Sequence, residues 1–152
     1  MQPKSSYPAT RVSLTPDVFP AVVEEFLRQP LAATLSTVNP SGAPQQTVMW
    51  FWYEGGDFLF TTLTGRVKFR NYLRDPRGSV AIVDPDDMFR YVIASGTFAV
   101  DDRDPVAFYR ELARRYLDDE GLARWRQTAV TEGRVVLRLT PTRRHIEGFP
   151  QA

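Results

Sequence analysis

The sequence contains no cysteine and only one histidine, His145. The absence of cysteine excludes disulfides, a thiol nucleophile and every cysteine-based zinc or iron–sulfur site. A single histidine argues against a multi-histidine metal centre, so we predict no metal site. Because His145 stands beside Arg143 and Arg144, we interpret it as a surface or partly buried residue rather than as a catalyst.

Long apolar runs are also missing. The longest run spans six residues, Val48–Tyr53, whereas a membrane-spanning helix needs about 20. The N-terminal residues lack the apolar stretch of about 7–15 residues that a secretory signal contains. Together with the lack of cysteine, these absences predict a soluble cytoplasmic protein that has no membrane partner.

The motifs of several enzyme classes are absent as well. Neither GxGxxG nor GxxxxGK[ST] occurs, so the Rossmann and P-loop fingerprints are excluded, and there is no GxSxG nucleophile motif. Neighbouring carboxylates occur at 86–87, 101–102 and 118–120. All three groups fall in expected loops or at helix ends, where solvation or capping explains them. We therefore predict no catalytic side chain.

Length and composition indicate an ordinary globular chain. The 152 residues are 43% apolar and 24% charged, which suits one domain with its own core. The net charge is +1 and the pI about 8.1, below the value of about 9 that is typical of nucleic-acid-binding domains. We expect a flexible tail over residues 1–14, a single domain over 15–152 and no nucleic-acid partner.

The hydrophobic pattern predicts a mainly β protein with flanking helices. A first helix is expected over 17–28, capped by Thr15, with Pro16 in its first turn. Turn signals at 39–42 and 54–57 separate three strands of a meander. The remaining elements do not alternate as in a parallel α/β fold, so we predict six antiparallel strands closed into a small split barrel, with helices packed outside. The expected strands are 31–38, 45–53, 58–62, 78–84, 90–100 and 133–146, and the later helices are 65–74 and 104–117, with a further turn or two over 121–127.

The second expected strand is apolar on both faces. Val48, Trp50 and Trp52 alternate with Met49, Phe51 and Tyr53, whereas a half-exposed strand alternates apolar with polar residues. The strand must therefore be covered twice, by a helix or by a second subunit. Because a barrel with few helices has little to cover it, we predict a homodimer.

Positive charge is concentrated in residues 60–77, where five basic residues face one acidic residue although the whole chain carries only +1. Thr61, Thr62 and Thr64 bring hydroxyl groups to the same turn, just before a predicted helix start. Hydroxyls, a helix N-terminus and basic side chains together favour a bound phosphate. A solvated basic helix face is the alternative. The neighbouring aromatic strand would let the flat ring of a phosphorylated cofactor pack beside that phosphate.

At this point the sequence resembles a known superfamily. The order L-A-T-L-S-T-x-x-x-x-G-x-P, then F-T-T-x-x-x-R-x-K-x-x-N, then D-P-x-x-x-x-R-Y-V and G-T is similar to the split β-barrel flavin-binding proteins typified by pyridoxamine 5′-phosphate oxidase. The matching stretches are residues 31–100 and 135–148. The resemblance is closest to the oxidoreductases that use the deazaflavin coenzyme F420.

The resemblance implies a homodimer with cofactor sites at its interface. It implies a cofactor ring resting near Thr47, Val48, Met49 and Trp50, with Phe60, Thr61 and Thr62 alongside. It implies a phosphate held by Thr62, Arg66, Lys68 and Asn71.

The resemblance also bears on the cofactor and the reaction. Pyridoxamine phosphate oxidases carry a basic R-x-V-L-L-K pattern in the second strand, but residues 45–51 here are uncharged. This difference favours F420 over FMN. The implied activity is hydride transfer from reduced F420 to a small conjugated or aromatic acceptor. An FMN-dependent oxidoreductase and a non-catalytic flavin- or haem-binding protein are the alternatives.

The basic helix also bears on the choice of cofactor. F420 carries a phosphate and a long anionic glutamyl tail, whereas FMN ends at its phosphate. Arg66, Arg70 and Arg74 are spaced four residues apart, so they are expected to form a ridge along one helix face. We expect this ridge to favour F420 over FMN, with an advantage that shrinks as salt rises.

Overall fold

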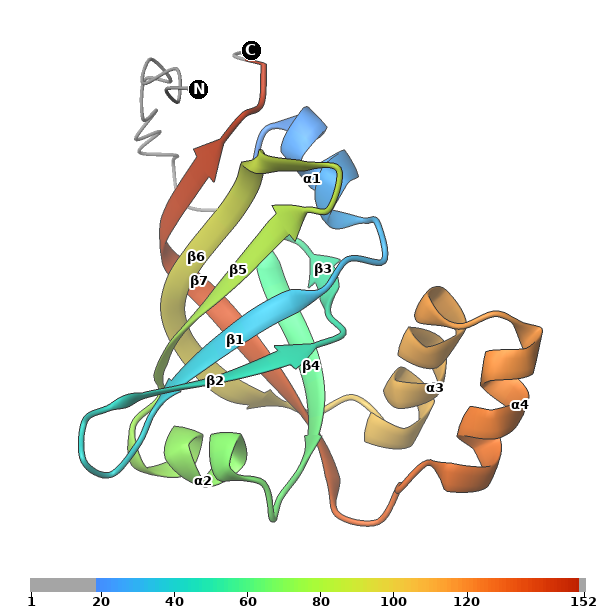
Figure 1. Cartoon of the computed structure of the whole chain (residues 1–152). Coiled ribbons are helices and arrows are strands. Elements are labelled where there is room, and N and C mark those ends of the chain that lie inside the picture. Colours follow the sequence, from blue (N-terminus) through green and yellow to red (C-terminus); the bar gives the residue numbers. More distant parts are fainter. Residues whose placement is uncertain (1–18, 151–152) are drawn as a thin grey trace.

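The computed structural model describes residues 19–150 and confirms a mainly β fold with flanking helices (Figure 1). The expected tail (1–14), the cap at Thr15 and the helix start at 17 lie outside the described residues. Within the described residues the first helix begins at Ala21, with Pro20 at its N-cap. The elements are α1 (Ala21–Leu27), β1 (Ala33–Val38), β2 (Pro44–Met49), β3 (Trp52–Glu54), β4 (Asp57–Leu63), α2 (Val67–Arg74), β5 (Arg77–Asp84), β6 (Asp87–Asp101), α3 (Pro105–Tyr116), α4 (Asp119–Thr128) and β7 (Arg134–Glu147).

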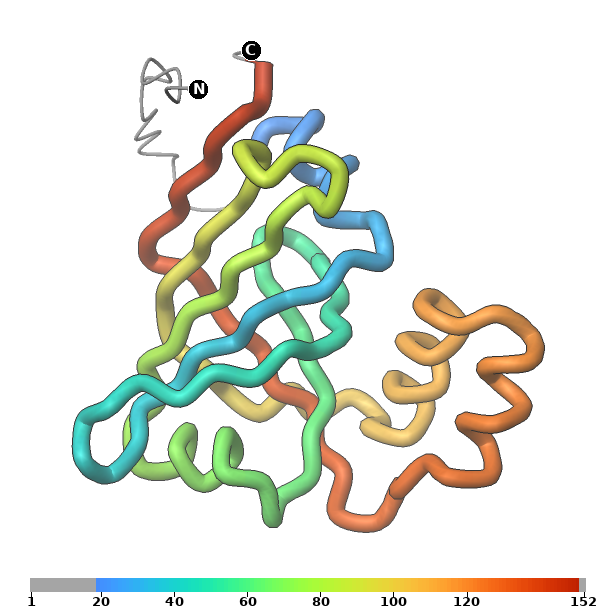
Figure 2. Tube along the Cα trace, viewed as in Figure 1, coloured from blue at the N-terminus to red at the C-terminus, as the bar shows by residue number. Residues whose placement is uncertain are grey.

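The described strands form one antiparallel sheet of seven strands in the order β2-β1-β5-β6-β7-β4-β3. The prediction of six strands closed into a barrel was wrong in this detail, because the expected strand 45–53 is interrupted at Trp50 and Phe51. Its two halves become the two edges of the sheet, which are joined by the chain and not by ladder hydrogen bonds. The trace shows the sheet curling until these edges approach (Figure 2).

The Tyr116 hydroxyl, on α3, accounts for the interruption. This hydroxyl accepts a hydrogen bond from the backbone N–H of Phe51 at 3.1 Å and donates one to the carbonyl of Leu31 at 2.6 Å. A side chain of α3 therefore satisfies backbone groups that a continuous strand would pair with a neighbouring strand.

The main core fills the inside of the curved sheet and is closed by α1. Its fully buried side chains include Phe51, Phe58 and Phe60, and α1 adds Val23, Phe26 and Leu27. Full burial of side chains of this size contributes about 1.5–3 kcal/mol each.

A second, smaller core lies between α3 and the sheet. Phe108 and Leu112 of α3 pack on Leu59 and Val136, and Trp50, Trp52 and Tyr116 pack against the same cluster. The two tryptophans of the apolar strand are therefore covered within the same chain. A second subunit is not needed to cover these two tryptophans, whereas Val48 of the same strand remains 70% exposed.

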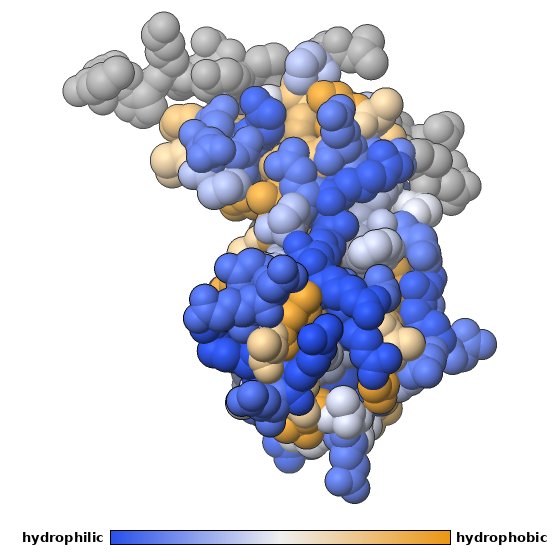
Figure 3. Space-filling model, turned by 90° about the vertical axis from the view of Figure 1, so that its right-hand side faces the viewer, coloured by the Kyte–Doolittle hydropathy of each residue, from blue (hydrophilic) through white to orange (hydrophobic). Residues whose placement is uncertain are grey.

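The two helices of the α3–α4 pair are capped as their sequences indicate. Asp104 accepts hydrogen bonds from the N–H groups of Val106 and Ala107, with Pro105 following it, and Asp118 accepts one from Gly121. The expected extra turn over 121–127 is thus a separate helix. The side of the molecule that carries these helices presents mainly hydrophilic residues, with separate apolar patches (Figure 3).

An ion-pair network ties the β3–β4 turn to β6 and β7. Arg138 contacts Asp57 at 2.8 Å and Asp101 at 2.9 Å, and Arg103 contacts Glu54 and Asp101, both at 2.7 Å. The Arg103 hydrogen bond lowers the pKa of Asp101 from 3.8 to about 2. Two of the neighbouring carboxylates noted in the sequence thus have structural roles: Asp101 in this network and Asp118 as a helix cap.

No helix within residues 19–150 is long and apolar enough to cross a membrane.

Candidate functional site

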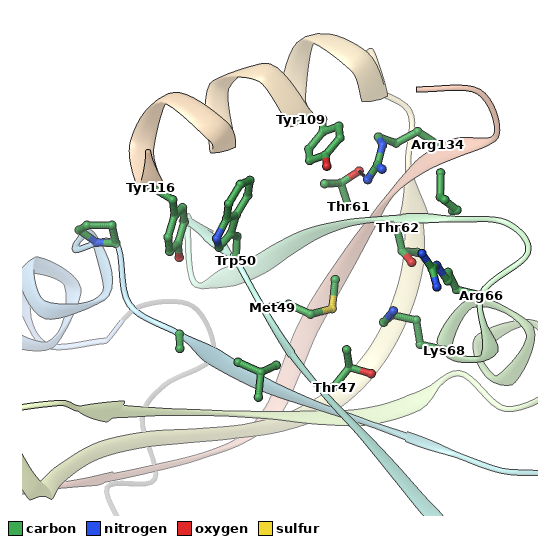
Figure 4. A pocket seen from close by; sticks show the side chains of 14 residues that line it. Thr47, Met49, Trp50, Thr61, Thr62, Arg66, Lys68, Tyr109, Tyr116 and Arg134 are labelled. Carbon is green, nitrogen blue, oxygen red and sulfur yellow. Dashed lines mark hydrogen bonds between the residues drawn. The ribbon is translucent and has the colours of Figure 1, made fainter. Parts of the chain in front are cut away.

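A cavity of about 720 Å³ lies where β2, β4, the start of α2 and one face of α3 meet (Figure 4). Eight of the ten predicted site residues line it. They are Thr47, Val48, Met49, Trp50, Thr61, Thr62, Arg66 and Lys68. The structure therefore brings the basic turn and the aromatic strand together around one space, but through the curl of the sheet and not through the expected hairpin, because β2 pairs with β1 and only β3 pairs with β4.

The other two predicted residues do not line this cavity. The Phe60 side chain is fully buried in the main core. Asn71 is 2% exposed and donates hydrogen bonds to Thr37 Oγ1 and Asn39 Oδ1, both at 3.0 Å. Asn71 faces this way because α2 packs against β1, which directs this residue of the helix toward the sheet.

Asn71 nevertheless connects to the cavity through a chain of hydrogen bonds. The Thr37 hydroxyl, which accepts from Asn71, donates to Gln45 Oε1 at 3.0 Å, and Gln45 Nε2 donates to Thr47 Oγ1 at 3.0 Å. Each donor finds an acceptor along this chain. Asn71, which does not line the cavity, thereby helps to fix the orientation of Thr47, which does.

One end of the cavity is cationic. Arg66, Lys68 and Arg134 all line it, and within residues 19–150 none of them forms an ion pair with a carboxylate. Burial lowers the pKa of Lys68, and the nearby Arg66 lowers it further. Because these three cations have no carboxylate partner among the described residues, an anion bound here would relieve their mutual repulsion.

Uncharged donors lie at the same end. The Thr62 hydroxyl and the N–H groups of Val67 and Lys68 have no hydrogen-bond partner in the part of the chain that the structure describes. Arg66 occupies the N-cap of α2 without a side-chain capping bond. Free N–H groups, a hydroxyl and flexible cations are the groups that bind phosphate oxygens.

The expected ridge along α2 is only partly available. Arg70 and Arg74 lie on the exposed side of the helix. The Arg74 guanidinium donates to the carbonyl of Val38 and to Asn71 Oδ1, so it holds α2 against the end of β1. Arg66 lines the cavity, so Arg70 is the one member of the expected ridge that is exposed outside the cavity and whose side chain makes no hydrogen bond to β1 or Asn71 among the described residues.

The opposite end of the cavity is aromatic. Trp50 stacks on Tyr116 with ring centroids 5.2 Å apart and an interplanar angle of 13°, and its centroid lies 6.4 Å from that of Tyr109. The sequence reasoning missed both tyrosines as cavity residues, since they fitted the apolar face of a helix. Their spacing of seven residues was the available signal, because it places both rings on one side of α3.

Arg134 was also missed. It pairs with Leu63 across the β4–β7 ladder, and its guanidinium lies 3.5 Å from the centre of the Tyr109 ring. Nothing in the local sequence around residue 134 distinguishes this arginine from a solvated strand end. His145 lies outside the cavity, against Tyr91 and 3.5 Å from a carboxylate oxygen of Glu147.

The model of the family described as pyridoxamine 5′-phosphate oxidase matches residues 19–146. The chain belongs to this family. Among solved structures, an F420 reductase is 35% identical with a TM-score of 0.69, over 83% of this chain and 98% of its own. A conserved hypothetical protein from Mycobacterium tuberculosis is 25% identical with a TM-score of 0.66, over 91% of this chain and 94% of its own.

A haem storage protein from Vibrio cholerae shares the fold of this family at 17% identity and a TM-score of 0.63, over 84% of this chain and 94% of its own. Curated proteins gave no significant match. The family resemblance noted from the sequence is thus confirmed.

Proposed function

We propose that this chain is an F420-dependent oxidoreductase that transfers a hydride from reduced F420 to a small conjugated or aromatic acceptor. The observation that carries the proposal is a single cavity with unpaired cations at one end and stacked aromatic rings at the other. Reduced F420, when bound, supplies the hydride, so the protein needs to bind and orient two partners rather than to provide a nucleophile.

The residues present fit the cofactor. Thr62, Arg66 and Lys68 would hold its phosphate, with donors that have no partner within residues 19–150. Thr47 and Met49 would line its ring, and Arg70 would lie near its anionic tail. The likeness to an F420 reductase at 35% identity supports this cofactor.

FMN is the second candidate cofactor, because the family model that matches is that of pyridoxamine 5′-phosphate oxidase. FMN would use the phosphate donors but not Arg70. A non-catalytic carrier of either cofactor would bind it in the same place without turnover.

We also propose that the protein acts as a homodimer that closes the cavity. Val48, Thr34, Ala81 and Ile93 are paired in one row across β2, β1, β5 and β6. Val48 in this row is 70% exposed and Ile93 is 38% exposed. Because Val48 also lines the cavity, a second copy seated on this row would cover its open side.

Titration of the purified protein with F420 and with FMN tests the proposed cofactor. We expect F420 to bind more tightly than FMN at about 0.05 M salt, and the difference to shrink at about 0.5 M as the contacts to the tail are screened. Binding of FMN as tightly as F420 at low salt would transfer the assignment to FMN. Binding without reduction of any conjugated acceptor would favour a carrier.

A further inference from the structure

Arg134 is held rigidly at the border between the cationic and aromatic ends of the cavity. Its Nε donates to the carbonyl of Val130 at 2.8 Å, and its Nη1 donates to Thr61 Oγ1 at 3.3 Å. The Tyr109 ring lies against the guanidinium at 3.5 Å. Nη2 has no hydrogen-bond partner among the described residues. The guanidinium is therefore fixed in position with donor capacity left over.

The charge of Arg134 is not compensated. Within residues 19–150 no carboxylate lies within ion-pairing distance of it, and the side chain is only partly exposed. Burial lowers its pKa, Tyr109 opposes this shift and Arg66 adds to it, but a guanidinium stays protonated in proteins. A cation that keeps its proton and has no carboxylate partner among the described residues favours an anionic ligand. A planar fork of donors suits a carboxylate best.

The neighbouring surface is flat and apolar. Tyr116 covers one side of the Trp50 indole, and the hydroxyl bonds of Tyr116 to Leu31 and Phe51 keep that stack in place. The indole stands between Tyr116 and the open cavity, and the Tyr109 ring faces the same space (Figure 4). A planar ligand ring can continue this stack, which favours aromatic groups over aliphatic ones of equal size.

We propose that Trp50, Tyr109 and Arg134 form a binding subsite for planar aromatic carboxylates, with the ring on Trp50 and the carboxylate on Arg134. Arg134 serves this subsite from the border between the two ends, because its bonds to Val130 and Thr61 hold its guanidinium against the Tyr109 ring. That the hydride acceptor binds in this subsite rests on the proposed function. The preference of the subsite for an aromatic anion does not depend on that function.

Calorimetric titration with 2-naphthoate and with its neutral methyl ester tests the subsite without requiring turnover. The wild-type protein should bind the acid about tenfold or more tightly than the ester, the scale of a charge-assisted hydrogen bond. Arg134→Gln should remove this preference while leaving affinity for the ester unchanged. Arg134→Lys, which keeps the charge but loses the fork, should retain part of it. Arg126→Gln, at an exposed arginine of α4 outside the cavity, is the matched control and should change neither affinity.

A parallel titration of F420 with the same variants separates the possible failures. Equal affinity of the wild-type protein for acid and ester would overturn the subsite. So would an Arg134→Gln variant that loses F420 affinity as strongly as naphthoate affinity, because Arg134 would then belong to the cofactor's anion site. If the protein prefers the acid to the ester, loses this preference in Arg134→Gln and does not bind F420, the subsite is supported and the proposed function is refuted.

Discussion

Replacing Tyr116 with phenylalanine should destabilise the fold at the point where the sheet is interrupted. The hydroxyl accepts from the N–H of Phe51, a residue that is fully buried, and donates to the carbonyl of Leu31. Removing it leaves a buried donor and a buried acceptor without their partner. Each such group costs about 1–3 kcal/mol, so we expect the free energy of unfolding to fall by about 2–6 kcal/mol.

Urea unfolding followed by circular dichroism measures this loss, and Tyr109→Phe is its matched control. Tyr109 lies on the same helix and lines the same cavity, but its hydroxyl makes no hydrogen bond among the described residues. The same chemical change there should cost less than about 0.5 kcal/mol. A loss of equal size in both variants, or a loss below about 0.5 kcal/mol for Tyr116→Phe, would refute the account of the strand break.

Two further predictions concern stability in acid and assembly. The pKa of Asp101 lies below its ordinary value of 3.8, at about 2, so its contribution is present above pH about 4 and is lost as the pH falls toward 2. Asp101→Asn should remove about 1–2 kcal/mol at pH 7 and less at pH 2, and an equal loss at both pH values would contradict this. Light scattering at micromolar concentration should give twice the chain mass of 17.3 kDa. Val48→Glu should shift the protein toward a monomer, and a monomeric wild type would refute the proposed dimer.

The parts of the candidate site whose position together the sequence predicted depend on neighbours in the chain. Thr62, Arg66 and Lys68 lie within one strand–turn–helix, so their charge and spacing place them together whatever the rest of the fold does. The turn at 54–57 likewise aligned β3 with β4. Local periodicity and turn chemistry were sufficient for these features.

The parts that the sequence did not predict depend on distant contacts. The break at Trp50 and Phe51 requires the hydroxyl of Tyr116, which lies 65 residues later. Arg134 enters the cavity because β7 pairs with β4 and α3 lies beside both, an arrangement that no local pattern encodes. Asn71 was assigned to the phosphate by resemblance alone, and the packing of α2 against β1 directs its side chain elsewhere.

The measurement that tests the central claim most directly is the dissociation constant of F420 for the wild type and for two variants of α2. Lys68→Ala should weaken binding by about 1.5–3 kcal/mol, the value of a hydrogen bond to a charged group. Asn71→Ala, whose side chain lies outside the cavity, should weaken it by much less. An unchanged dissociation constant for Lys68→Ala would contradict the account, and the cationic end of the cavity would then be a solvated surface rather than a cofactor site.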